Sequence, residues 1–131
     1  MMAADTNVLL RYILKDDEKQ FATAAAFFGA RSPEDPAFIC QIVLCEMAWT
    51  LAQRYKFSRT QITSIIEALL ETSEIHVEDE EIVSAAIADA SPTADFADLM
   101  IALRASMSGC SSTVTFDKGA AISVPGMELL A

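Results

Sequence analysis

The chain has 131 residues, of which 53% are hydrophobic, and its formal net charge is −10. This length predicts one domain over residues 1–131, large enough to fold without disulfides or structural zinc. Three cysteines with no Cys-x-x-Cys pair argue against a disulfide framework, an iron–sulfur site or a zinc site. We expect a cytoplasmic protein without a membrane segment, because neither a signal peptide nor a membrane-spanning run is visible. The acidity alone argues against nucleic-acid binding, which usually relies on a basic surface.

The elements expected up to residue 56 are a strand, two helices, a second strand and a third helix. They cover residues 2–5, 6–14, 17–29, 37–40 and 41–56. Asp17 with Gln20 three residues later resembles a capping box, which marks the start of the second helix. Two prolines in residues 32–36 predict the loop that follows it.

The second half of the chain continues the alternation of helices and strands. The expected elements cover residues 58–72, 75–77, 78–90, 95–108, 112–116, 117–121 and 127–130. Ser58 with Gln61 gives another capping box, and Gly109 suits the end of the helix before it. Residues 117–121 are a turn or a short helix. The order of elements predicts an α/β domain with a mostly parallel sheet of four to five strands, flanked by helices.

Two aspartates follow predicted strands. Asp5 stands where the first strand meets the first helix, and Asp117 follows the strand at residues 112–116. Ligands bind outside the C-terminal strand ends of an open parallel sheet, so both positions suit a functional site. Each aspartate also has an ordinary alternative role: Asp5 as a helix N-cap, and Asp117 as a turn residue.

Glu46 is an acid within a largely apolar helix. Its neighbours on the same helix face include Ile42 and Trp49. We therefore expect its carboxylate on an apolar face, where it needs a hydrogen bond or a cation. The alternative is a buried salt bridge to an arginine such as Arg11 or Arg54.

Asp95 and Asp98 are three residues apart and share one face of a predicted helix. Asp98 is followed by apolar residues, so we expect it to point inward; its alternative is a solvated surface acid. Asp95 has a helix N-cap as its alternative. Clustered carboxylates raise one another's pKa unless a cation is present, and such oxygen ligands favour Mg²⁺ or Mn²⁺. His76, the only histidine, is expected to be structural or exposed.

Four segments around these acids resemble the motifs of the PIN-domain family, especially its VapC-type toxins. They are residues 5–12, residues 43–49, residues 94–102 and residues 115–117, which follow the family's order and span nearly the whole chain. The first strand is less apolar than is usual in the family. The position before Leu99 favours Asp98 over Asp95 as the main ligand in the third motif.

The resemblance implies a Mg²⁺- or Mn²⁺-dependent endoribonuclease that is the toxin of a toxin–antitoxin pair. Such toxins usually cut structured RNA such as transfer RNA or ribosomal RNA, form homodimers, and are blocked by a small antitoxin protein. The catalytic, metal-binding residues would be Asp5, Glu46, Asp98 and Asp117, with Asp95 as a further ligand. Asn7 and Thr115 would orient ligands or water, and Arg11 would contact phosphate.

Two other functions fit part of the pattern. A phosphohydrolase of the haloacid-dehalogenase type also begins with a strand-end aspartate, but it needs a second aspartate where this chain has Asn7. A non-catalytic, acidic protein-binding module would use the same acids as solvated charges. A cation titration separates this module from a metal enzyme, since a metal site stabilises the fold as it fills.

Overall fold

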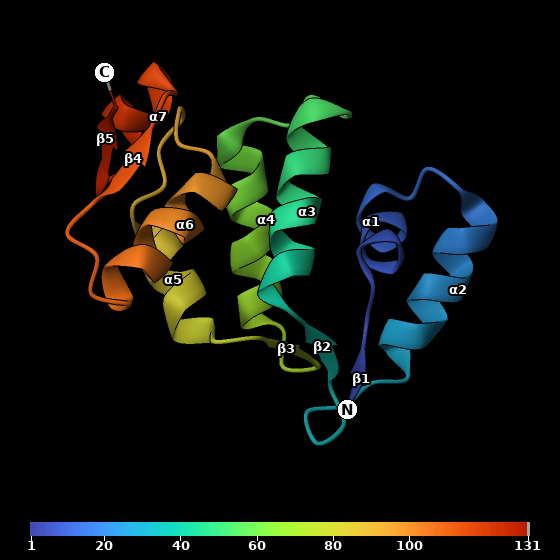
Figure 1. Ribbon diagram of the computed structural model, residues 1–131. Coiled ribbons are helices and arrows are strands. Elements are labelled where there is room, and N and C mark those ends of the chain that lie inside the picture. The colour runs from blue at the N-terminus through green and yellow to red at the C-terminus, as the bar shows by residue number, and fades with distance from the viewer. Residues whose placement is uncertain (131) are drawn as a thin grey trace.

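The computed structural model describes residues 1–130, and this part of the chain contains seven helices and five short strands (Figure 1). The strands are β1 (Met2–Ala3), β2 (Ala37–Ile39), β3 (Ile75–Val77), β4 (Thr113–Thr115) and β5 (Met127–Leu129). The helices are α1 (Thr6–Leu14), α2 (Glu18–Gly29), α3 (Gln41–Gln53), α4 (Arg59–Glu71), α5 (Glu80–Ala88), α6 (Phe96–Met107) and α7 (Lys118–Ser123). None of these helices combines the length and apolar character needed to cross a bilayer. The predicted α/β class is confirmed.

All strand pairings are parallel, as predicted, but the strands form two sheets rather than one. One sheet has the order β1-β2-β3, and the other consists of β4 and β5. The division follows from the path of α6, which packs against α5 and α3 and leads the chain to β4. As a result, β4 and β5 lie on the opposite side of the molecule from β1 (Figure 1).

Local sequence patterns set the helix ends. The Asp17 side chain accepts a hydrogen bond from the Gln20 amide at 2.9 Å, which caps α2. Ser58 and Gln61 form both bonds of a capping box at the start of α4. Gly109 follows α6 with a φ of +94°, a left-handed conformation that favours glycine. All three predicted helix ends are confirmed.

The hydrophobic core is built around α3. This helix contacts α1, α4 and α6, and its Leu44, Met47 and Leu51 side chains are completely buried. From the surrounding elements, Leu9 of α1 and Ile39 of β2 are equally buried. The position of α3, and of any functional side chain on it, is therefore fixed by packing on several sides.

Candidate active site

Asp5 and Glu46 are joined through Thr6. Asp5 caps α1 from the end of β1, and its Oδ1 accepts a hydrogen bond from the Thr6 amide at 2.7 Å. The buried Thr6 hydroxyl donates to Glu46 Oε1, also at 2.7 Å, and so connects α1 to α3. We call Asp5 and Glu46 the α1–α3 acid pair. The cap predicted as the alternative for Asp5 is present, yet both carboxylates remain exposed.

The surroundings of Glu46 differ from the expectation. Its neighbours on the helix face are apolar, but this face is open to solvent: Ile42 is 72% exposed and Trp49 is 56% exposed. The hydrogen bond expected for this carboxylate is supplied by Thr6, although the Glu46 side chain itself is exposed to solvent. The alternative salt bridge to Arg11 is also absent, since Glu46 is held by Thr6 and Arg11 pairs with Asp16.

The other three candidate acids lie near one another, and we call Asp95, Asp98 and Asp117 the α6 acid cluster. Asp95 caps α6 by accepting from the Asp98 amide at 3.2 Å, and its other oxygen pairs with Arg59 at 3.3 Å. Asp117 caps α7 by accepting from the Ala120 amide at 3.0 Å. The N-cap role considered for Asp95 is therefore present, and Asp117 has a capping role of its own.

The surroundings of Asp98 raise the pKa of its carboxyl group. Its side chain is half-buried, and burial is the first cause that raises the pKa of its carboxyl group. The charges of Asp95 and Asp117 raise this pKa further, while Arg59 opposes them. A carboxylate held near two others is destabilised as an anion, and a bound cation would offset this repulsion.

This pKa shift predicts how Asp98→Asn affects stability. Because the pKa of Asp98 is raised by folding, its contribution to stability is present only at acidic pH and is lost as pH rises through the folded-state value. At neutral pH the charged Asp98 therefore opposes folding. Without metal, the Asp98→Asn protein should melt at a higher temperature than wild type at neutral pH, and the difference should shrink toward pH about 4.

Thermal unfolding in EDTA, followed by circular dichroism at both pH values, measures this difference. Glu67→Gln provides the matched control, because Glu67 is exposed on α4. Its melting temperature should follow that of wild type at both pH values. An Asp98→Asn protein that melts below wild type at neutral pH would show that the carboxylate stabilises the fold.

Among the described residues, no hydrogen bond or ion pair joins the α1–α3 acid pair to the α6 acid cluster. Helix α3 contacts both α1 and α6 (Figure 1). Its adjacent residues Cys45 and Glu46 interact with different elements. The nearby charge of Asp95 helps raise the pKa of the Cys45 thiol, after the larger effect of burial, whereas Glu46 bonds to Thr6. Within residues 1–130, no three His, Cys, Asp or Glu side chains are placed to hold one metal ion. The donors suit Mg²⁺ or Mn²⁺ in chemical type, but the structure gathers them in two sets.

The remaining predicted residues lie beside these acids or near them. Asn7 is exposed in the first turn of α1, next but one to Asp5. The Thr115 hydroxyl accepts from the Asp117 amide at 3.0 Å, so Thr115 fixes the backbone at that acid. Both positions agree with an orienting role, which stays a prediction.

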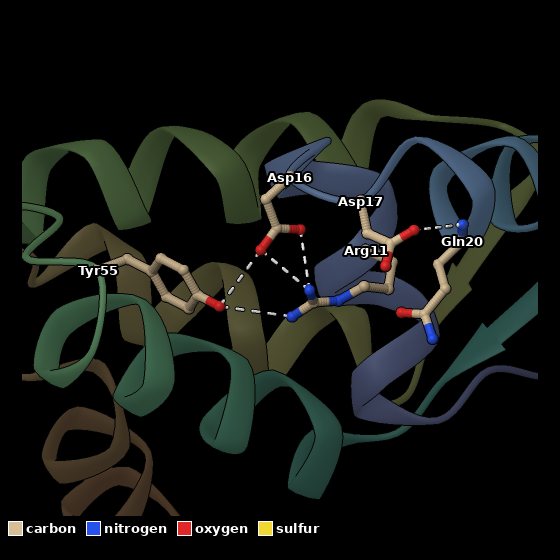
Figure 2. Close-up of polar contacts among 5 residues, drawn as sticks. All are labelled: Arg11, Asp16, Asp17, Gln20 and Tyr55. Atoms are coloured by element: carbon tan, nitrogen blue, oxygen red, sulfur yellow. Dashed lines mark hydrogen bonds and ion pairs between the residues drawn. The ribbon is translucent and has the colours of Figure 1, made fainter.

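The Arg11 side chain pairs with Asp16 and Tyr55, and with none of the candidate metal ligands. Figure 2 shows its guanidinium between Asp16 and Tyr55, with Nη1 2.9 Å from both Asp16 oxygens and Nη2 3.4 Å from the Tyr55 hydroxyl. These bonds tie the end of α1 to the chain after α3. The predicted contact of Arg11 with phosphate stays a prediction, and such a contact would have to compete with Asp16.

Sequence reasoning missed three residues of this region. Thr6 was detectable, because a hydroxyl next to a strand-end aspartate is well placed to bond a second acid. Arg59 was not, because it is far along the chain from Asp95, the acid that it pairs with. Trp49 was treated only as a residue of an apolar face, whereas it is 56% exposed one turn along α3 from Glu46.

The comparison with protein-family models gives one match. The model of the PIN domain matches residues 2–123, from β1 through α7, and so includes all the acids described above. Proteins with this domain are typically nucleases that use divalent metals. A search of the curated proteins finds no match. Because the family model covers nearly the whole chain, the protein belongs to the PIN-domain family.

Proposed function

We propose that this protein is a divalent-metal-dependent endoribonuclease and the toxin of a VapBC-like toxin–antitoxin pair. Its membership of a family of nucleases supports the reaction class. The observation that supports the metal dependence is the placement of Asp98 on α6 beside Asp95, which caps that helix, and near Asp117, which caps α7. A bound cation would offset the repulsion among these carboxylates, which supports the proposed metal dependence.

The proposed ligands of Mg²⁺ or Mn²⁺ are Asp5, Glu46, Asp98 and Asp117, with Asp95 as a further ligand. The metal would supply an activated water and neutralise charge on the phosphate. The protein's own part is to hold the carboxylates in place. Thr6 fixes Glu46, and Arg59 fixes Asp95. Asn7 and Thr115 are proposed to orient ligands or water beside Asp5 and Asp117.

The proposed substrate is structured RNA, such as transfer RNA or ribosomal RNA. A net charge of −10 repels RNA over most of the surface, so binding depends on the metal and on uncharged contacts. The same charge suits a basic protein partner, which supports a small antitoxin with a basic segment. The homodimer and the cytoplasmic location stay predictions.

Cleavage of RNA by the purified protein tests the proposal. Transfer RNA and ribosomal RNA are incubated with the protein in Mg²⁺, in Mn²⁺ and in EDTA, and the ends of the products are sequenced. We expect cleavage in either metal, with 5′-phosphate and 3′-hydroxyl ends, and its loss in EDTA. Cleavage that persists in EDTA would rule out the metal-dependent mechanism.

Trp49 should contribute to substrate binding. Its ring is 56% exposed one turn from Glu46, and stacking of a base on an aromatic ring contributes about 1–3 kcal/mol. Trp49→Ala should therefore raise KM for RNA by roughly 5- to 150-fold, with a smaller effect on kcat. Steady-state kinetics measure the two constants. Trp49→Phe keeps a ring and should retain most of the affinity, whereas equal values for alanine and wild type would exclude stacking.

A non-catalytic, acidic binding module remains the second candidate. The observation in its favour is that Asp5, Glu46 and Asp117 are exposed, as solvated charges would be. A titration of melting temperature with Mg²⁺ and Mn²⁺ separates the two functions. A real site raises the melting temperature as it saturates, whereas solvated charges give no saturable shift.

A further inference from the structure

A cavity of about 640 Å³ lies between β1, α1 and α2. Its apolar walls are formed by Ala3, Val8, Ala24 and Phe27. Small-molecule sites in proteins usually have volumes of roughly 300–1,000 Å³, with mostly apolar walls and a few polar groups that orient the ligand. None of the acids proposed as metal ligands lines this cavity, so the proposed function leaves it without a role.

Three side chains bring polar groups without a protein partner to this cavity. Asn7 and Gln20 each contribute a carboxamide, and Lys19 contributes an ammonium group. Within residues 1–130, no hydrogen bond or ion pair involves any of these three groups. Each carboxamide offers both a donor and an acceptor, and the ammonium group offers a positive charge.

The backbone of Ala3 adds one further donor and one further acceptor. The Met2 and Ala4 amides donate to Pro36 O at 3.3 Å and to Phe38 O at 3.0 Å, so both amides face β2. Because successive peptide groups of a strand point to opposite sides, the N–H and C=O of Ala3 point away from β2. Ala3 also lines the cavity, which therefore has an adjacent donor and acceptor at its edge.

The charged groups at the cavity nearly balance. Arg11 and Lys19 are its cations and Asp17 is its acid, and Figure 2 shows Asp17 beside Arg11. Arg11 pairs with Asp16, so its charge is already compensated. Asp17 Oδ1 accepts from the Gln20 amide at 2.9 Å, and the other oxygen makes no hydrogen bond within the described chain. The cavity thus offers a ligand one uncompensated cation, Lys19, and an additional acceptor on Asp17.

These features suit a nucleotide better than a segment of protein. The polar edge of a nucleobase carries adjacent donors and acceptors, while its flat faces pack against apolar side chains. A protein strand would need a longer edge, because β1 has two residues and only Ala3 of these faces outward. The outer edges of β3, β4 and β5 also have no partner strand among the described residues, but they do not line this cavity.

We propose that the cavity between β1, α1 and α2 binds one unpaired nucleotide of an RNA chain. The base packs against Val8 and Phe27. Its polar edge forms hydrogen bonds with the Ala3 N–H and C=O and with the Gln20 carboxamide. Lys19 contacts a phosphate group. Proteins recognise RNA sequence mostly through such unstacked bases, which are available in loops, bulges and chain ends.

The place of this nucleotide in the reaction rests on the proposed function. Ala4 and Asn7 line the cavity, and they flank Asp5 and Thr6 in the sequence. A nucleotide in the cavity therefore brings its neighbouring phosphate toward the α1–α3 acid pair. Cleavage should accordingly fall next to unpaired nucleotides and not within duplex segments.

An NMR titration in EDTA tests binding without reference to activity. The isotope-labelled protein is titrated with a short single-stranded RNA, with the blunt duplex that this RNA forms with its complement, and with a nucleoside 5′-monophosphate. The single strand should shift the signals of the Ala3 backbone amide and the Gln20 side-chain amide, and leave the Val114 amide of β4 unchanged. The duplex should cause no such shift, because its bases are paired. The monophosphate should bind at least about 10-fold more weakly than the single strand, since it lacks the neighbouring phosphates.

Gln20→Ala tests the base contact with little risk to the fold. The cap of α2 uses the Gln20 backbone amide, so the substitution leaves it intact. It should raise the dissociation constant for the single strand by roughly 2- to 10-fold. Gln53→Ala is the matched control, because Gln53 is an exposed glutamine at the end of α3 and does not line the cavity. Its affinity should equal that of wild type.

Ala3→Pro provides an independent change at the backbone. It removes an N–H that makes no bond to β2, so the sheet stays paired while the base loses a donor. The dissociation constant for the single strand should rise by a similar factor, whereas Ala3→Ser keeps the N–H and should bind as wild type does. Circular dichroism checks that all variants fold.

The outcomes separate this inference from the proposed function. Unchanged Ala3 and Gln20 signals with the single strand, or equal affinities of Gln20→Ala and Gln53→Ala, would overturn the nucleotide site and leave a protein segment as the better occupant. Equal affinities for the monophosphate and the single strand would overturn the assignment to RNA in favour of a free nucleotide. A protein that binds the single strand in this cavity but cleaves no RNA supports the site and contradicts the proposed function.

Discussion

Asp5→Asn and Asp98→Asn proteins are expected to cleave RNA at least about 100-fold more slowly than wild type in Mg²⁺. Each change removes one negative charge from the proposed metal site and leaves the size of the side chain unchanged. The amide introduced by Asp5→Asn retains a carbonyl oxygen that can still accept the Thr6 amide bond, so α1 keeps its cap. The loss should therefore be catalytic and not structural. Initial rates with a radiolabelled RNA, beside circular dichroism of each variant, measure the two effects separately.

The control for this experiment is Glu67→Gln, which removes the same charge from the exposed surface of α4. Its cleavage rate should match that of wild type. If both aspartate variants cleave as fast as this control, the acids do not bind a catalytic metal. If all three are slower by the same factor, net charge matters and the individual positions do not.

The sequence was sufficient for the local structure of this protein. Capping by Asp17, and the paired bonds of Ser58 and Gln61, involve residues three positions apart, so the pattern contains both partners. The parallel strands followed from the alternation of elements. Helix and strand positions that depend on short-range bonds and on periodicity are thus predictable from residue type and spacing.

The sequence was insufficient where one face had to be distinguished from another. Ile42, Glu46 and Trp49 form an apolar stripe interrupted by an acid, and such a stripe usually faces the core. Here α3 is covered on its other faces, and the stripe is left exposed. Which face is covered depends on the neighbours of α3 in space, and those neighbours come from distant parts of the chain.

The arrangement of the acids shows the same limit on a larger scale. Asp95 and Asp98 were recognised as a pair because they are close in sequence. The proximity of Asp98 to Asp117 depends on how α6 leads to β4. A one-sheet arrangement and a two-sheet arrangement have the same order of strands and helices, so the pattern alone does not distinguish them.

The largest loss of stability should come from Leu44→Ala. Leu44 is completely buried on α3, and removing a buried leucine side chain costs about 2–5 kcal/mol, a large part of the roughly 5–15 kcal/mol that holds a domain folded. Ile42→Ala, two residues away on the same helix, is the matched control. Ile42 is 72% exposed, so this change should alter the free energy of unfolding by only about 0.5 kcal/mol.

Urea denaturation followed by circular dichroism gives both free energies. Equal losses from the two substitutions would contradict the burial of this face of α3. The result also bears on the site, because Leu44 packing positions the helix that presents Glu46 to Thr6. Leu44→Ala should therefore lose RNA cleavage at a lower temperature than wild type, in step with its unfolding. Ile42→Ala should lose cleavage at the same temperature as wild type, since the anchoring faces of α3 stay packed.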